Sequence, residues 1–153
     1  MILRLVTSVL VFGLVGCTGG DSGEPLLSGS MTGEYDGHSF TPAFGFATLY
    51  KGAGLIGVGD GPLHCGSESS MAPPSGTNAL FSVPLEVGSK GTVSVQMIRN
   101  VDGYEGVGAN TGSVTVSAVS DESLTGTVSF DYTDTQSRHF LISGSFEVVH
   151  CAP

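Results

Sequence analysis

From about residue 31 onward the chain alternates apolar and polar residues with a period of two, and this pattern constrains the fold most. Its clearest runs are residues 79–85, 92–98, 112–119, 124–132 and 140–150. Glycine separates or interrupts the runs, and the chain has 24 glycines in 153 residues. A period of two sends successive side chains to opposite faces of a strand, whereas a helix needs a period near 3.6. The chain is therefore predicted to be all-β, without a helix.

About eight short strands, each with one apolar face, must pack around a common core to be stable. Asp36-Gly37 between two such runs predicts a tight hairpin, and Pro42 predicts an edge or a bulge. A turn is expected at residues 88–91, and the last three runs should form an antiparallel meander. The favoured architecture is an antiparallel β-sandwich of about eight strands. A small up-and-down or Greek-key β-barrel is the alternative.

The first sixteen residues differ in kind from the rest. They read MILRLVTSVLVFGLVG, in which Arg4 precedes an apolar run from Leu5 to Val15. Spanning the hydrocarbon core takes about 20 apolar residues, so this run is too short. A short basic start followed by such a run is typical of a secretory signal peptide. We therefore expect a signal peptide at 1–16, a Gly- and Ser-rich flexible tether at 17–30, and a single β domain at 31–153.

The end of this segment, Leu14-Val15-Gly16-Cys17, resembles the lipobox of bacterial lipoproteins. The resemblance implies cleavage before Cys17 and attachment of diacylglycerol to the Cys17 sulfur. Two or three acyl chains anchor a protein stably, whereas one chain binds only marginally. The residue after the cysteine is Thr18. In enterobacteria an aspartate at this position favours retention in the inner membrane, so Thr18 predicts transfer to the outer membrane. The expected location is the bacterial cell envelope, through a lipid anchor.

With Cys17 assigned to lipid, Cys65 and Cys151 remain. Cysteine pairs outside the cytoplasm are normally oxidised, so these two are predicted to form a disulfide. The dipeptides His64-Cys65 and His150-Cys151 leave a Cys₂His₂ metal site as an alternative. Neighbouring side chains of an extended segment point to opposite faces, which argues against that site. No metal is predicted.

The charge balance excludes some partners. The chain has 14 acidic and 5 basic residues, with a net charge of −9. Nucleic-acid binding needs a basic surface that replaces phosphate counterions, so we expect no nucleic-acid partner. The sequence contains no HExxH, no P-loop and no strand–GxSxG–helix pattern, so we predict no catalytic residue, no cofactor and no enzyme. The four histidines are interpreted as surface or strand-end residues: His38, His64, His139 and His150.

Residues 100–112 are the best candidate for an interaction surface. This stretch is long and Gly-rich, and it carries Tyr104 near its middle. An aromatic side chain on a loop is a common binding contact. The possible binding loop comprises Asp102, Tyr104, Glu105 and Asn110. The acidic and amide side chains of this loop lack the regular spacing of a calcium-binding loop.

Three functional interpretations follow. The leading one is a lipid-anchored cell-envelope β-domain with a non-catalytic binding or structural role, whose partner is an envelope protein or a glycan. The alternative is an acidic inhibitor of a basic envelope-targeting enzyme such as lysozyme. The chain is similar in broad type to small acidic periplasmic lipoproteins that inhibit lysozyme, although Thr32-Gly33-Glu34-Tyr35 departs from their Ser-Gly-x-x-Tyr loop motif. A hydrolase is the third interpretation.

Overall fold

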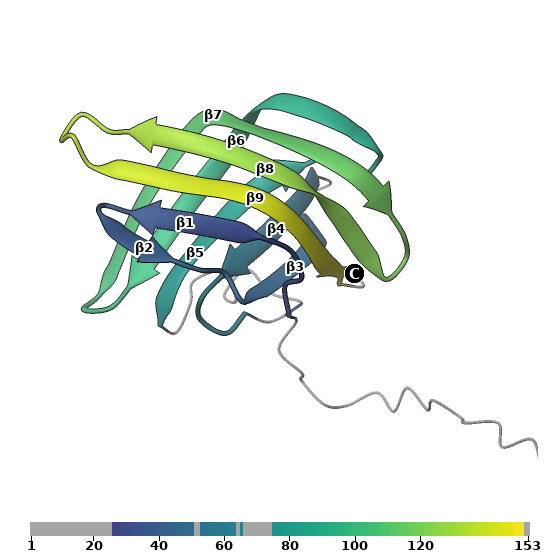
Figure 1. The fold of residues 1–153 in the computed structure, drawn as a ribbon, viewed down its shortest axis with the longest axis horizontal. Coiled ribbons are helices and arrows are strands. Elements are labelled where there is room, and N and C mark those ends of the chain that lie inside the picture. Colours follow the sequence, from purple (N-terminus) through teal and green to yellow (C-terminus); the bar gives the residue numbers. More distant parts are fainter. Residues whose placement is uncertain (1–25, 51–52, 64, 66–74, 152–153) are drawn as a thin grey trace, which may run out of the picture.

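The computed structural model describes residues 26–50, 53–63, 65 and 75–151. This part of the chain is all-β, as predicted, and contains no helix, hence none long and apolar enough to cross a membrane. Figure 1 shows the strands. They are β1 (Met31–Tyr35), β2 (His38–Phe40), β3 (Phe44–Tyr50), β4 (Ala53–Gly59), β5 (Gly76–Val83), β6 (Gly88–Asn100), β7 (Tyr104–Val119), β8 (Ser123–Thr133) and β9 (His139–His150).

The strands from β3 to β9 form a closed seven-stranded barrel. Each strand pairs antiparallel with the next, and β9 closes the ring on β3 through the parallel pairs Phe46–Val149 and Ala47–His150. The closing pair is parallel because an up-and-down ring with an odd number of strands brings first and last strands together in the same direction. Strands β1 and β2 are extra, and β1 pairs with the first half of β9.

The barrel alternative therefore fits the structure better than the favoured sandwich. The deciding element is β9, which is 12 residues long. One edge of β9 pairs with β8 along its length, and the other edge is shared by β1 and then β3. Two separate sheets cannot form when one strand joins both sides of the molecule in this way.

Alternate residues of the strands point into the barrel and form its core. In β8 and β9 these inward positions include Val128, Phe130, Ile142 and Phe146, each at most 3% exposed. Gly126 lies among them because a Cβ atom there would approach Cζ of Phe146 to 2.7 Å. A smaller apolar cluster comprises Phe46, Leu63 and Cys151, with Phe44 packed beside it.

The short-range predictions are largely confirmed. Asp36 and Gly37 have φ angles of 49° and 78° and connect Tyr35 to its partner His38, as a two-residue hairpin requires. The last three strands form the predicted antiparallel meander. Pro42 lies between β2 and β3, so the run of residues 38–50 forms two strands and not one. Part of the predicted tether touches the barrel, because Leu27 N donates to the carbonyl of Ala43 at 3.0 Å.

Two predicted connections were wrong. The turn expected at residues 88–91 lies inside β6, whose pairs with β7 begin at Gly88. The loop expected at residues 100–112 is mostly strand, because β7 begins at Tyr104 and only 101–103 form the turn. Glycines caused both errors, since a strand without side chains at alternate positions shows no period of two.

Candidate functional site

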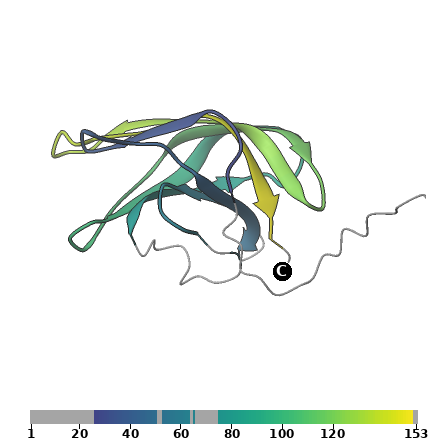
Figure 2. The same cartoon turned by 60° about the horizontal axis from the view of Figure 1, so that its bottom comes forward.

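One end of the barrel collects three hairpin turns. These are the β1–β2 turn at residues 36–37, the β6–β7 turn at 101–103 and the β8–β9 turn at 134–138, on the left in Figures 1 and 2. The strand register places the β1–β2 turn beside the β8–β9 turn. Tyr35 at the end of β1 pairs with Phe140, and Thr133 at the end of β8 pairs with His139. Figure 2 shows that the β6–β7 hairpin diverges from the other two. We call this side the open end of the barrel.

The divergence follows from where the β7–β8 pairing stops. Its last pair toward the open end is Ser113–Ser129. Beyond it, among the described strands, β7 pairs only with β6 at residues 104–109 and 112, and residues 130–133 of β8 pair only with β9. We call these two free edges together the seam. Backbone N–H and C=O groups along a free edge are available to another strand.

A hollow of about 270 Å³ lies at the β6–β7 turn. Its lining includes three of the four residues predicted for the binding loop, Asp102, Tyr104 and Glu105, whereas Asn110 lies farther along β7 and is not part of it. Arg99 also lines the hollow and is the cross-strand neighbour of Glu105. Sequence reasoning missed Arg99, although its place immediately before the expected loop was a usable signal.

Two large apolar side chains stand out at this turn. Val101 is 60% exposed and Tyr104 is 64% exposed. Both line the hollow beside the charged Arg99 and Glu105. An exposed aromatic ring next to a charged pair can supply apolar contact, hydrogen bonds and charge to one ligand. The turn therefore offers the mixed chemistry of a binding site.

The hydroxyl of Tyr35, next to the β1–β2 turn, is a buried polar group of the open end. Tyr35 is fully buried and its ring packs edge-on against Phe140 with centroids 4.9 Å apart. Its Oη atom has no hydrogen-bond partner within the part of the chain that the structure describes. Burial raises the pKa of Tyr35, the nearby charge of Glu105 adds to the rise, and Arg138 opposes it. The phenol is therefore a neutral group within electrostatic reach of the hollow.

The β8–β9 turn is held by one carboxylate. Asp134 Oδ2 accepts a hydrogen bond from Nε of Arg138 at 2.8 Å, and Oδ1 accepts from the backbone N–H groups of Gln136 and Arg138. Burial raises the pKa of Asp134, but these hydrogen bonds outweigh it, so the pKa is lowered overall. Arg138 also lies over the ring of Phe140, 5.5 Å from its centroid. These contacts fix Arg138 at the open end.

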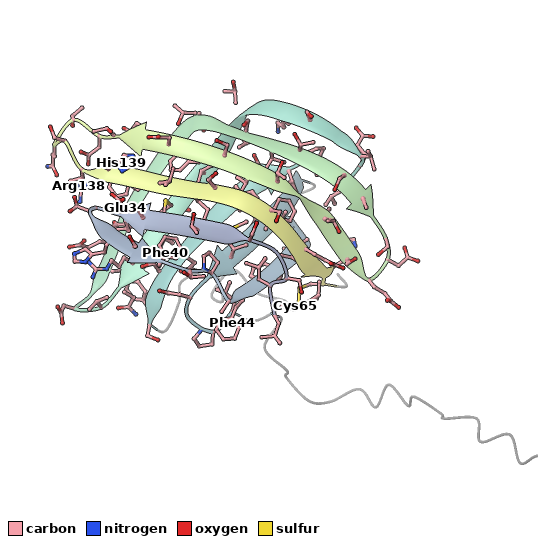
Figure 3. The ribbon with its side chains drawn as sticks, viewed as in Figure 1. Glu34, Phe40, Phe44, Cys65, Arg138 and His139 are labelled. Carbon is pink, nitrogen blue, oxygen red and sulfur yellow. A yellow bond between two sulfur atoms is a disulfide. The ribbon has the colours of Figure 1, made fainter. Side chains whose placement is uncertain are left out.

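A second polar group was not expected from the sequence. His139 of β9 lies between Glu34 of β1 and Asp131 of β8, and Figure 3 labels His139 and Glu34 near one another. Nδ1 is 3.0 Å from Glu34 Oε1, and Nε2 is 3.0 Å from Asp131 Oδ1. The hydrogen bond to Glu34 and then that to Asp131 raise the pKa of His139. No local motif could reveal this group, because each residue comes from a different strand.

The predicted disulfide is present at the other end of β9. Cys65 and Cys151 are bonded, with Cα atoms 5.5 Å apart and a sequence separation of 86. Cys151 N also donates to the carbonyl of Ala47, which fixes the end of the chain to β3. His64, part of the alternative metal site, lies outside the described residues. Within those residues, no group of three or more His, Cys, Asp or Glu side chains is placed to hold a metal ion.

The stretch compared with the inhibitor motif has a different setting. Thr32–Tyr35 belongs to strand β1 and pairs with β9, so it is not a loop. A Cβ atom on Gly33 would collide with the ring of Phe40, which covers this position. Comparison of the chain with family models, with curated proteins and with solved structures gives no match.

Proposed function

We propose that the protein is a lipid-anchored β-barrel of the bacterial cell envelope that binds a partner at its open end and performs no catalysis. The observation that carries the anchor is the division of the three cysteines. Cys65 and Cys151 are joined to each other, so the cysteine that remains is Cys17. Cys17 ends the lipobox-like sequence Leu14-Val15-Gly16-Cys17, where a lipoprotein carries its lipid.

The binding role is supported by the open end. The hollow at the β6–β7 turn combines exposed apolar side chains with a cross-strand charged pair, and the hydroxyl of Tyr35 is buried nearby. Binding sites often lie on turns that a rigid scaffold positions, and the barrel with its disulfide is such a scaffold. Charged and aromatic groups without a nucleophile–base arrangement support recognition rather than reaction.

Metabolic labelling with radioactive palmitate tests the anchor. The wild-type chain and a Cys17→Ser variant should be expressed in a bacterium that processes lipoproteins. We expect label in the wild type and none in Cys17→Ser, while Cys65→Ser should keep its label. Equal labelling of the wild type and Cys17→Ser would overturn the anchor. In an enterobacterial host, Thr18→Asp should move the labelled protein from the outer to the inner membrane fraction.

Site-specific photocrosslinking in cells tests the binding end. A photoreactive residue should replace Tyr104 in one variant and Val87 in another, since the two side chains are 64% and 66% exposed. Val87 lies in the β5–β6 connection and serves as the matched control. We expect a crosslinked partner at position 104 and not at 87. Crosslinking of the same partner with equal yield at both positions would contradict a binding site at the open end.

A further inference from the structure

The seam is an unusually long free edge for a barrel. On the β7 side it comprises residues 104–112, which pair with β6 except at the bulge of residues 110–111 and which have no described strand on the other edge. On the β8 side it comprises residues 130–133, which pair only with β9. A single extended chain in the seam would have hydrogen-bonding groups on both of its edges. Within the described residues, the free edge on β2 is only three residues long, and residues 88–94 of β6 are unpaired on the side of β5.

The β7 edge also lacks the features that block strand addition. Folded proteins protect free edges with lysine, proline or covering side chains. Residues 104–112 contain neither lysine nor proline. Gly106 and Gly108 are uncovered, because a Cβ atom at either would meet only atoms of the neighbouring strand β6, at 3.6 Å or more. Neither glycine therefore has a side chain that could shield the edge from an incoming backbone.

Apolar side chains along the seam are incompletely covered. Where β7 pairs with β8, its inward residues Val114 and Val116 are each 1% exposed. Where it does not, Val107 and Ala109 are only half-buried against the same core. Tyr132 of β8 is half-buried as well. A strand with apolar side chains at alternate positions would cover this row, as β8 covers the valines.

Charge decides what kind of strand fits. The chain has a net charge of −9, and the two acidic residues of the seam, Glu105 and Asp131, have Arg99 and His139 as neighbours. A second copy would bring two strongly acidic chains together, and their repulsion disfavours self-pairing. A neutral or basic segment has the complementary charge. The seam thus fits an extended segment of about nine residues that is apolar at alternate positions and neutral or basic overall.

We propose that the seam binds such a segment of another protein as an added strand between β7 and β8. This inference names the partner class for the binding role proposed above and rests on that role, although it is independent of the lipid anchor. The bound backbone would complete an eight-stranded barrel, with main-chain hydrogen bonds for affinity and its alternate side chains for selectivity.

A synthetic peptide tests the proposal on the full chain purified in detergent. The probe is a fluorescein-labelled nine-residue peptide of alternating valine and threonine with a lysine at each end. Fluorescence anisotropy measures its binding, and hydrogen exchange with mass spectrometry locates it. We expect saturable binding and about tenfold slower exchange of amides in 104–112 and 130–133, with the β2 edge unchanged. A peptide in which proline replaces each valine should not bind.

A variant of the protein gives a second criterion. Val107→Lys places an inward charge in the seam and should weaken peptide binding about tenfold or more. Ser113→Lys is the matched control, because Ser113 is exposed where β7 already pairs with β8, and it should bind as the wild type does. If Val107→Lys does not fold, the proline peptide still tests the proposal, because that peptide is measured against the wild-type protein.

Three results would overturn the proposal. They are absence of peptide binding to the wild type, equal binding of the proline peptide, and protection of the β2 edge in place of the seam. Sedimentation that shows a dimer with 104–112 already protected would assign the edge to a second copy instead. Each result leaves the palmitate-labelling outcome unaffected, and crosslinking at Tyr104 without peptide binding would retain a binding role while rejecting strand addition.

Discussion

The Nδ1 atom of His139 lies 3.0 Å from Oε1 of Glu34, although 105 residues separate them in the sequence. The other ring nitrogen, Nε2, is 3.0 Å from Oδ1 of Asp131. A neutral imidazole has one N–H and can donate to only one of these carboxylates, whereas the imidazolium donates to both. The contact between the extra strand β1 and the barrel strands β8 and β9 is therefore complete only when His139 is protonated.

This geometry predicts that the protein loses stability as pH rises above the ordinary histidine pKa of 6.5. The two carboxylates raise the pKa of His139 from its ordinary value of 6.5. Stabilisation from a raised pKa is fully present below the pKa of the unfolded chain and is lost as pH rises through the folded value. The free energy of unfolding, measured in urea from pH 5.5 to 9, should fall across this interval. In His139→Gln that fall should disappear, and an unchanged pH profile would refute the interpretation.

Removal of the disulfide should lower stability strongly. Closing a loop of 86 residues between Cys65 and Cys151 stabilises the fold by roughly 4–5 kcal/mol through the unfolded state, as an upper value. The double variant Cys65→Ser, Cys151→Ser should therefore lose about 4 kcal/mol in urea unfolding. Dithiothreitol should reduce the stability of the wild type by a similar amount and leave the double variant unchanged. Sensitivity of the double variant to the reductant would contradict this assignment.

Gly126 should tolerate no side chain. A Cβ atom there would collide with the carbonyl oxygen of Thr115 and lie 2.7 Å from Cζ of Phe146. Gly126→Ala should cost about 1–3 kcal/mol, as overpacking of a core does. Gly91→Ala is the matched control, because nothing lies within 4 Å of its Cβ position, and it should change stability by less than about 0.5 kcal/mol. Equal losses in thermal unfolding would show that the cost is not steric.

Gly37 should show a purely conformational cost. Its φ is 78° and its Cβ position is open, so Gly37→Ala adds backbone strain without a clash. We expect a loss of about 1 kcal/mol in urea unfolding. Ser39→Ala, on an exposed position of the same hairpin, should be nearly neutral. A neutral Gly37→Ala would mean that the turn changes type.

The sequence correctly predicted those structural features that can be inferred without knowing which distant segments pair. Asp36-Gly37 specifies its turn through backbone conformation, and alternation marks Phe130, Phe146 and Val128 as inward residues of strands. The cysteine count predicted the Cys65–Cys151 bond. None of these needs knowledge of a distant segment.

Features that depend on distant pairing were missed. Alternation says which face of a strand is buried but not which strand lies opposite, so a sandwich was preferred to a barrel. In β7 the register shifts between its pairs Val95–Ala109 and Val93–Gly112, so inward residues change from odd to even numbers. Because of that shift, and because Gly106 and Gly108 have no side chains, the sequence predicted a loop where the first half of β7 lies. The contact of His139 with Glu34 likewise depends on the pairing of β1 with β9.

The bond between Cys65 and Cys151 also makes residues 65–151 a covalent ring that holds β5 to β9. A protease that cuts the exposed β6–β7 turn would open this ring without releasing a fragment. Both pieces would stay joined, and they would separate in electrophoresis only after reduction. The barrel therefore retains every strand after one cut in this exposed turn.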